Sequence, residues 1–424
     1  MKIKLPQINL ILLCGSIFLI AFGSSVNIIM AFFAIQGLVL LCKKKTELFN
    51  TPVQKYFLAF FLCYWIPVGI SIIGAANIER PLTRVFIGHL PYYFTGLFLI
   101  EFLKEKARRD IALKSFFVSL LVWGIDAYIQ QIFGRDLLGY KYDPELMRLG
   151  GPFKHAYSFG YYMAILSPFA LFYAVIKKWS ATKGTLLFLF VTPLVILGNT
   201  RTGWMVYTVV STLFLSAFYL RKAKRKILWI LAAMAVFSGI TFGVYKTLPV
   251  VTQRVDKTLS GFSGGLDALN QATSGRVCYW ICLWNCYKDN PVNGVGARCF
   301  RYVAEKYWPE NNYGYNYGGK VYFHHPHNFV MERAVGTGTI GLLGLLGEYV
   351  IAILIWLKAD KKTRRYALPV AVSLIAFNFP LDLGAALYAT KHSAIWWLIT
   401  GFYFANLTSG IDCKEPKEYA ENSI

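Results

Sequence analysis

The sequence has few charged residues and very few acidic ones. Charged side chains make up 16% of the 424 residues, and 22 Asp and Glu stand against 44 Lys and Arg, which gives a formal charge of +22. Hydrophobic residues make up 56%, and apolar runs of about 17–25 residues recur from end to end, each able to cross a hydrocarbon core about 30 Å thick. This pattern excludes two or three soluble domains, and it predicts an all-α polytopic membrane protein.

The excess of basic residues does not indicate nucleic-acid binding. Most of the excess lies in short clusters between the apolar runs, where the positive-inside rule of membrane proteins accounts for it. We therefore expect membrane lipids, and no nucleic acid, among the partners of this chain.

The amino-terminal segment lacks a convincing small-residue cleavage site. It starts with the basic Met1-Lys-Ile-Lys and runs into an apolar stretch, and a second apolar run follows almost at once. We therefore interpret the first run as a retained helix and not as a removed signal peptide.

The eight cysteines lack the spacing of a zinc site. Cys278, Cys282 and Cys286 repeat every four residues and so lie on one face of a predicted helix, with no histidine or second cysteine pair at zinc-finger spacing beside them. Neighbours on one helix are poorly placed to bridge each other. A disulfide from one of them to Cys299 remains an alternative.

The apolar runs predict about twelve transmembrane helices. The runs cover residues 8–23, 26–42, 55–75, 85–103, 111–130, 156–176, 185–198, 203–220, 227–245, 329–357, 366–382 and 385–407. The chain would then divide into helices 1–9 within residues 1–245, a long segment at 246–328, helices 10–12 within 329–407 and a tail at 408–424.

Basic clusters occupy every second connection between these runs. The clusters are Lys43–Lys45, Lys104–Arg109, Lys177–Lys178, Arg221–Lys226 and Lys358–Arg365. The positive-inside rule places them in the cytoplasm together with both termini. The other side then receives the loop with Glu79, Arg80 and Arg84, the loop 131–155, the turn 198–203 and the long segment 246–328.

The long segment is the one stretch on that other side with room for a structured cap, because roughly 80 residues without structure would be unusual. Ser274–Lys288 has a helical pattern, and the following Asp289–Gly296 is typical of a helix end and a turn. We therefore predict a long loop that contains helices.

Two arginines on that side are candidate ligand-binding residues. Arg201 lies in the tight turn 198–203, where positive residues are disfavoured; its side chain either snorkels into the headgroups or serves a functional site. Arg276 begins a helix that carries Trp280 and Trp284, so it is either a surface arginine of an amphipathic helix or points at a ligand at headgroup depth.

Histidine is scarce, and half of the histidines lie within four positions of the sequence. Three of the six histidines are His324, His325 and His327, directly before the apolar run that starts at 329. His327 is either a helix-entrance hydrogen-bonding residue or a general base, since a neutral imidazole accepts a proton near pH 7. A metal site is the rival interpretation of the cluster, but Glu332 is the nearest acid and stands five positions from His327.

One base and two arginines on one side of a membrane favour a particular chemistry. The guanidinium fork matches phosphate oxygens, and a diphosphate leaving group needs its developing charge stabilised. The set predicts transfer from a lipid diphosphate donor to a hydroxyl, without a metal ion or other cofactor.

An ordered set of short motifs resembles the bacterial O-antigen ligase family. His327-Asn328, nine residues and then Gly338-Thr-Ile-Gly341 follow the family pattern of His, a polar residue, nine residues and Gly-x-x-Gly, although Leu342 stands where the family usually has Gly, Thr or Tyr. Asn199-Thr-Arg201 and Ser274-Gly-Arg276 resemble the two arginine sites of the family. Pro291–Gly296 resembles the segment that precedes its histidine.

The resemblance covers nearly the whole chain and implies a membrane glycosyltransferase with a GT-C-like helical fold and one long periplasmic loop. It implies transfer of polysaccharide from undecaprenyl diphosphate to a sugar hydroxyl of the lipid A–core oligosaccharide, at the periplasmic face of the bacterial inner membrane. By position, His327 would be the base and Arg201 and Arg276 would bind the diphosphate. Single displacement would invert the anomeric carbon.

Further site candidates and rival functions follow from the same sequence. Arg84, Arg148 and His325 are weaker site candidates, because they are chosen by their side of the membrane alone. An O-antigen polymerase with the same donor is the nearest rival, and a ligase of glycans to protein is a variant of it. A lipid-linked sugar transporter would instead need charged residues deep in several apolar runs, where Glu101, Asp126 and Asp382 are the main acids seen.

Overall fold

A computed structural model of the chain describes residues 5–144, 147–219, 249–313, 328–380 and 387–411, together with the single residues 239, 243, 245, 246 and 326. Within these ranges the regular elements are helices, and strand-like pairing is limited to two isolated bridges, Arg135 with Lys141 and Asp143 with Arg148. The predicted all-α class is therefore confirmed for this part of the chain. The predicted run 227–245 falls almost wholly outside it.

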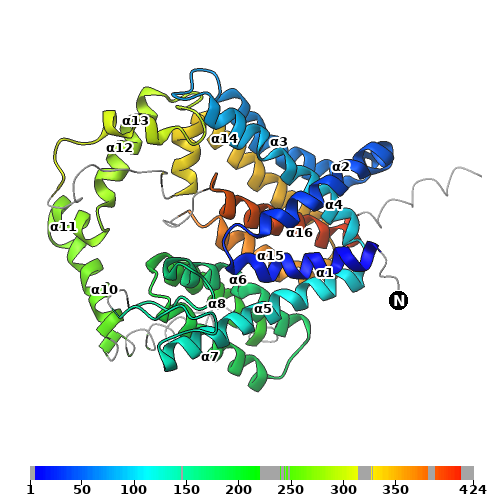
Figure 1. Ribbon diagram of the computed structural model, residues 1–424, viewed down its shortest axis with the longest axis horizontal. Coiled ribbons are helices and arrows are strands. Elements are labelled where there is room, and N and C mark those ends of the chain that lie inside the picture. Colours follow the sequence, from blue (N-terminus) through cyan, green and yellow to red (C-terminus); the bar gives the residue numbers. More distant parts are fainter. Residues whose placement is uncertain are drawn as a thin grey trace, which may run out of the picture.

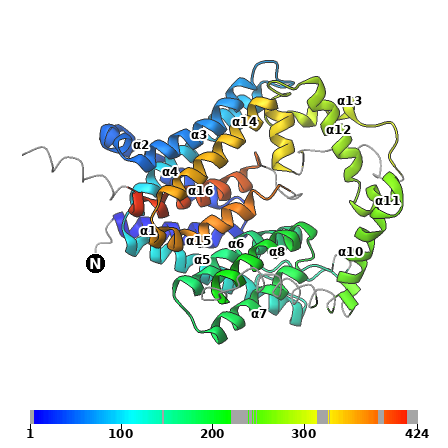
Figure 2. The ribbon, with the colours of Figure 1, turned by 180° about the vertical axis from the view of Figure 1, so that it is seen from behind.

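The helices form a bundle and, beside it, an arc (Figures 1 and 2). The bundle contains α1 (Leu5–Phe18), η1 (Leu19–Ala21), α2 (Val26–Asn50), α3 (Pro52–Ile70), η2 (Arg80–Ile87), α4 (Leu90–Phe102), α5 (Lys106–Phe133), α6 (Ala156–Ile176), α7 (Ala181–Leu197), α8 (Arg201–Tyr219), α14 (Phe329–Lys358), α15 (Lys361–Phe377) and α16 (Thr390–Ile411). The arc contains α10 (Pro249–Leu259), η3 (Ser260–Phe262), α11 (Gly265–Ala272), α12 (Arg276–Asp289) and α13 (Phe300–Tyr307).

The bundle confirms a polytopic membrane protein at the level of helix length and composition. Seven helices of the described chain are long and apolar enough to cross a membrane, and two shorter apolar helices, Leu5–Ala21 and Ala181–Leu197, pack with them. The predicted boundaries of α6 and α14 are correct to within one residue. The total of twelve crossings and the GT-C-like arrangement stay predictions.

The edges of the last two predicted runs were wrong. α15 ends at Phe377 and not at 382, because Asn378 closes the helix and Pro380 cannot continue it. α16 begins at Thr390 and not at 385. Before it, the backbone N–H of Leu387 donates a hydrogen bond to Oε2 of Glu332 at 2.6 Å. This N–H is therefore bound to a side chain of α14 and not to a carbonyl within a helix.

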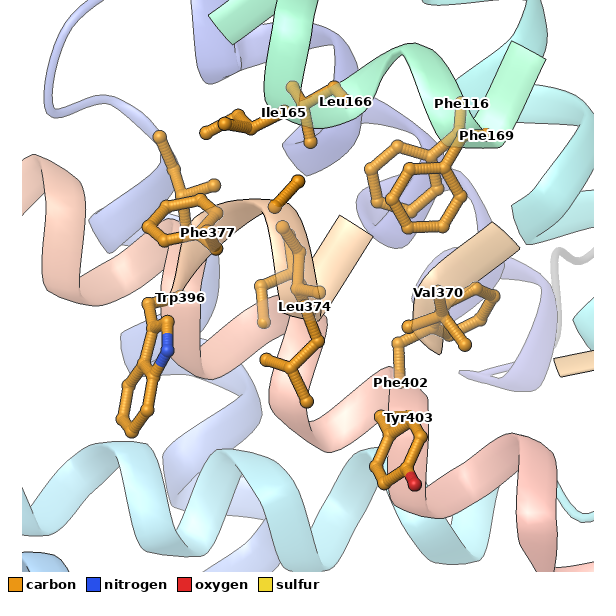
Figure 3. Close-up of a cluster of buried hydrophobic side chains, with 14 of the residues drawn as sticks. Phe116, Ile165, Leu166, Phe169, Val370, Leu374, Phe377, Trp396, Phe402 and Tyr403 are labelled. Atoms are coloured by element: carbon orange, nitrogen blue, oxygen red, sulfur yellow. The ribbon is translucent and has the colours of Figure 1, made fainter. Parts of the chain in front are cut away.

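The centre of the bundle is packed with aromatic and aliphatic side chains from α5, α6, α15 and α16. Phe116 and Phe169 stack with their ring centroids 3.8 Å apart, and Phe402 and Val370 lie close to them in Figure 3. α6 is buried over most of its length. A helix that is apolar all round belongs in such a core, which explains why its sequence has no polar stripe.

A largely apolar cavity of about 500 Å3 adjoins this core. Trp396, Leu374 and Tyr403, all drawn in Figure 3, are among its lining residues. α14 supplies a charged lining residue, Glu348, and Asn378 is a further polar residue of the lining.

Small residues bring α14 against α3. A Cβ atom on Gly344 would lie only 2.2 Å from the carbonyl oxygen of Cys63 in α3. No other residue fits at that distance, so glycine is required for the contact.

The basic connections meet at one end of the bundle. The hydroxyl of Tyr366 donates to Oδ1 of Asp110 at 2.8 Å, and Arg365 donates to the carbonyl of Val175 at 3.0 Å. Lys358, at the end of α14, lies over the ring of Tyr56 at the start of α3. The clusters near 104–109, 177–178 and 358–365 therefore share one end, as the charge alternation requires, while Arg221–Lys226 lies outside the described residues.

The arc joins the bundle at the opposite end of α14. In both ribbon views it curves away from the bundle, from beside α7 and α8 to α14 and α3, on the edge far from the N terminus (Figures 1 and 2). The predicted helix at 274–288 is confirmed as α12, which ends at Asp289 as predicted. The segment 249–313 is thus a helical cap on the end that carries Arg201 and Arg276.

Candidate functional site

The turn before α8 fixes the position of Arg201. Asn199 has a positive φ of 49°, and its side-chain amide donates to the carbonyl of Met147 at 3.2 Å. The N–H of Leu149 donates to the carbonyl of Leu197 at 3.0 Å. These bonds place the loop 131–155 beside the turn and leave Arg201 as the first residue of α8, directed at the arc.

Arg201 binds the arc directly. Its Nη1 donates to the carbonyl oxygen of Ala272 and lies 3.4 Å from Oγ1 of Thr258, and its Nη2 donates to Oγ of Ser274 at 3.1 Å. Its side chain is half-buried. A residue that merely snorkels to a headgroup would not make this set of protein contacts, so Arg201 links α8 to the residues that precede α12.

Arg276 follows directly on that contact. Ser274 and Gly275 both have positive φ, 59° and 83°, and so turn the chain sharply before α12 starts at Arg276. Asn270 holds the turn, since its carbonyl accepts from the N–H of Gly275 at 2.8 Å and its side chain accepts from the N–H of Val277 at 3.1 Å. The two predicted arginines, 75 positions apart in the sequence, are therefore brought to one place.

The weaker candidates separate into two places. Arg148 lies in the loop segment that borders the Arg201 turn, with its guanidinium 4.2 Å from the ring centroid of Tyr157. Arg84 is exposed on η2 and acts electrostatically on Arg298, in the turn between α12 and α13. Arg148 thus lies beside the Arg201 turn, whereas Arg84 lies on η2 of the bundle and faces the turn between α12 and α13.

The histidine candidates lie outside the described residues. His325 and His327, and His324 beside them, fall in the range that the structure leaves undescribed. The next residue, Asn328, is the N-cap of α14, because its side chain accepts from the N–H of Met331 at 3.0 Å and donates to the carbonyl of Pro380 at 2.7 Å. The predicted helix entrance is confirmed, and the role of His327 as the base stays a prediction.

Two motifs of the sequence meet at a break in α14. Gly338 has φ 64° and ψ −160°, which interrupts the helix, and a Cβ there would lie 2.2 Å from the carbonyl oxygen of Val292. The N–H of Thr339 donates to Pro291 at 2.7 Å, and the N–H of Val295 donates to the carbonyl of Val335 at 2.9 Å. Backbone groups released by the break are thus satisfied by the Pro291–Gly296 turn, as an irregular membrane helix requires.

The cysteines of α12 form a small core with the end of the turn. Cys282, Cys286 and Cys299 are fully buried together with Phe300 and Val335, and they and Cys278 are free thiols. Burial raises the pKa of Cys282 and of Cys286 to about 12. These thiols are therefore protonated packing groups, and the disulfide left open by the sequence is not formed.

Sequence reasoning missed a buried ion pair inside α14. Nη2 of Arg333 lies 2.6 Å from Oε1 of Glu348, with both side chains almost fully buried, and the guanidinium lies 4.6 Å from the ring centroid of Tyr64. The hydroxyl of Tyr64 in turn lies 2.5 Å from Nδ1 of His89. The signal was present as two opposite charges in the apolar run 329–357, where charges are expensive and usually functional or paired.

The acids that the sequence did single out have local partners. Glu101 pairs with Lys104 at 2.7 Å at the end of α4, and Asp126 accepts from the N–H of Leu137 at 2.8 Å. Asp382 lies outside the described residues. Glu101 and Asp126 therefore make local contacts near helix ends, and Arg333 and Glu348 pair with each other inside α14.

Comparison with known proteins identifies the domain that holds these residues. Residues 185–346 match the family model of the O-antigen ligases, a range that includes Arg201, Arg276, His327 and the motif that begins at Gly338. No curated protein matches the chain. The chain therefore carries, over residues 185–346, the domain of the O-antigen ligase family, as the motifs of its sequence predicted.

Proposed function

We propose that this protein transfers a polysaccharide from undecaprenyl diphosphate to a sugar hydroxyl of the lipid A–core oligosaccharide. Arg201 and Arg276 bind the diphosphate of the donor, and His327 is the general base. The reaction uses no metal ion or other cofactor. One observation carries the proposal: Arg201 is bound to Ser274, two positions before Arg276, within the segment that matches the O-antigen ligases.

The chemistry follows from the residue types. His327 takes the proton of the acceptor hydroxyl while its oxygen forms a bond to the anomeric carbon of the donor. The bond from that carbon to the diphosphate oxygen breaks, and the electron pair leaves with the diphosphate, whose charge the arginines stabilise. One displacement inverts the anomeric carbon, so retention of its configuration in the product would contradict this mechanism.

The proposed orientation places the site in the periplasm and both termini in the cytoplasm of an inner-membrane protein. Support comes from the basic connections, which share the end of the bundle opposite to the arc. Reporter fusions at the connection 177–180 and in the loop 131–155 would test it. Cytoplasmic signal from the first and periplasmic signal from the second are expected, and the reverse pattern would contradict it.

Reconstitution tests the activity itself. The purified protein is mixed with a lipid-diphosphate-linked glycan and lipid A–core, with a chelator present throughout. Glycan on the core is the expected product. Loss of transfer with the chelator would restore the metal interpretation of the histidine cluster.

The same assay separates the rival functions. Longer glycans on the lipid carrier, without any on the core, would assign polymerase activity. Movement of the lipid-linked sugar across vesicles without a new glycosidic bond would assign transport.

A further inference from the structure

A second group of arginines lies where η2 meets the turn between α12 and α13. Nε of Arg80 donates to the hydroxyl of Tyr302 at 2.7 Å. The N–H of Ala76 donates to the carbonyl of Val295 at 3.0 Å, and Sγ of Cys299 lies 3.2 Å from the carbonyl of Asn77. These bonds fix the segment that carries Arg80 and Arg84 against the segment that carries Arg298 and Arg301. We call Arg80, Arg84, Arg298 and Arg301 the second arginine group.

Three of these guanidinium groups act electrostatically on the fourth, Arg298. Burial lowers the pKa of Arg298, and Arg301 lowers it further; Glu332 opposes this, while Arg80 and Arg84 add to it. Glu332 is the acid that acts on Arg298 there, but it already accepts a hydrogen bond from Leu387. Arg298 therefore lies among three further guanidinium groups, and Glu332 is the acid that acts on it.

Packing does not explain this concentration. Like charges repel and cost free energy in the absence of an anion. Within the described residues the side chains of Arg84 and Arg298 make no hydrogen bond or ion pair. Arg298 also has φ 64°, a left-handed conformation that costs a non-glycine residue free energy and is concentrated at ligand sites.

The second arginine group adjoins the proposed donor site. Arg276 and Arg301 both lower the pKa of Tyr279, which burial raises. Tyr279 is buried in α12, with its ring centroid 6.0 Å from that of Phe300. Arg276 of the proposed donor site and Arg301 of the second arginine group thus both act electrostatically on Tyr279.

We propose that the second arginine group binds a phosphate group of the acceptor saccharide, while Arg201 and Arg276 hold the diphosphate of the donor. This rests on the proposed function. The guanidinium fork fits phosphate oxygens, and a reaction that joins two substrates needs a second site beside the first. The phosphate sets where the acceptor lies, so that its hydroxyl faces the donor.

The test measures binding and transfer separately, on the full chain in lipid nanodiscs. The variants are Arg298→Gln, the double substitution Arg84→Gln with Arg298→Gln, and the conservative substitution Arg298→Lys. Arg135→Gln replaces a matched exposed arginine outside the group. The probes are a phosphorylated core oligosaccharide, the same oligosaccharide after phosphatase treatment, and a short-chain polyprenyl diphosphate.

The double variant is expected to bind the phosphorylated oligosaccharide about 10- to 100-fold more weakly, as loss of charged hydrogen bonds predicts. Its affinity for the polyprenyl diphosphate stays unchanged, and Arg298→Lys loses less affinity than Arg298→Gln does. In transfer assays the acceptor KM rises while kcat with saturating acceptor is retained. Arg135→Gln behaves as the native chain.

Several results would overturn the assignment. They are equal binding of the treated and untreated oligosaccharide, a matched loss of affinity for the polyprenyl diphosphate, and an effect seen only when anionic phospholipid replaces phosphatidylcholine. The last would assign the group to a membrane headgroup. If the native chain shows no transfer but binds the oligosaccharide through its phosphate, the proposed function fails and the binding site stands.

Discussion

The two ends of the arc are attached to the bundle in different ways. At the α8 end, the side chain of Arg201 makes the contact, through Ala272, Thr258 and Ser274. At the α14 end, backbone groups of residues 291–295 bond to the backbone of 335–340. One attachment depends on the identity of a single side chain, and the other depends on the path of the main chain.

The two kinds of attachment suit two different roles, ligand binding at the α8 end and positioning of a helix at the α14 end. A side-chain attachment can exchange its partners for the oxygens of a ligand, and Arg201 is the residue proposed to bind the diphosphate. A backbone attachment offers no such exchange, and it fixes the helix that begins directly after His327 and Asn328. Substitutions at the first end should therefore change activity, whereas those at the second end should change stability.

The largest expected effect is on activity at the α8 end. Arg201→Ala should lower kcat/KM about 100- to 1,000-fold, the range found when a charge-stabilising donor is removed, while Arg201→Lys should recover part of it. Transfer rates with purified protein measure this, and thermal unfolding checks that the fold remains. Native activity of Arg201→Ala would contradict the claim that the α8 end of the arc binds the donor.

The next largest effect is a loss of stability when the buried ion pair of Arg333 and Glu348 in α14 is broken. Glu348→Ala should destabilise the protein by about 3–5 kcal/mol, because it leaves Arg333 as an uncompensated buried charge. The double substitution Arg333→Leu with Glu348→Leu should recover most of that loss. Thermal unfolding in detergent measures both, and a double variant no more stable than Glu348→Ala would contradict a pairing role.

A smaller loss of stability is expected from a substitution at the break in α14. Gly338→Ala forces a side chain into a positive φ and against Val292, which should cost about 1–3 kcal/mol. Gly15→Ala, where a Cβ meets only an ordinary contact at 3.9 Å from Ile29, is the control. An unchanged melting temperature for Gly338→Ala would mean that the break is not required.

The smallest effect concerns the thiols of the small core at the same end. Because the folded pKa of Cys282 and Cys286 is about 12 against 9.0 for an ordinary thiol, their stabilising contribution is complete below pH 9 and is lost as the pH rises toward 12. Maleimide should label the exposed Cys42 at pH 8 and spare both. Their rapid labelling in the folded protein would show that this end opens.

The sequence predicted those features that depend on local pattern. Periodicity and apolar length gave α6 and α14, and the turn chemistry at Asp289–Gly296 gave the end of α12. The alternation of basic clusters predicted correctly that the clusters near 104–109, 177–178 and 358–365 share one end. Each of these follows from neighbours in the chain.

Features that depend on distant contacts were not predictable in this way. Gly338 breaks α14 because the turn at 291–295 offers its backbone groups other partners, and no pattern within the run 329–357 indicates this. The Arg333–Glu348 pair was overlooked within an apolar run. The arginines at 201 and 276 were placed on one side, whereas the bond through Ser274 required the fold.

The measurement that tests the central claim most directly is the transfer rate of His327→Ala in the reconstituted reaction. Donor and acceptor are saturating, chelator is present, and His155→Ala, an exposed histidine outside the proposed site, is the control. Transfer that resists the chelator, collapses in His327→Ala and persists in His155→Ala is the predicted result. Transfer that persists in His327→Ala would contradict the role of this histidine as the base.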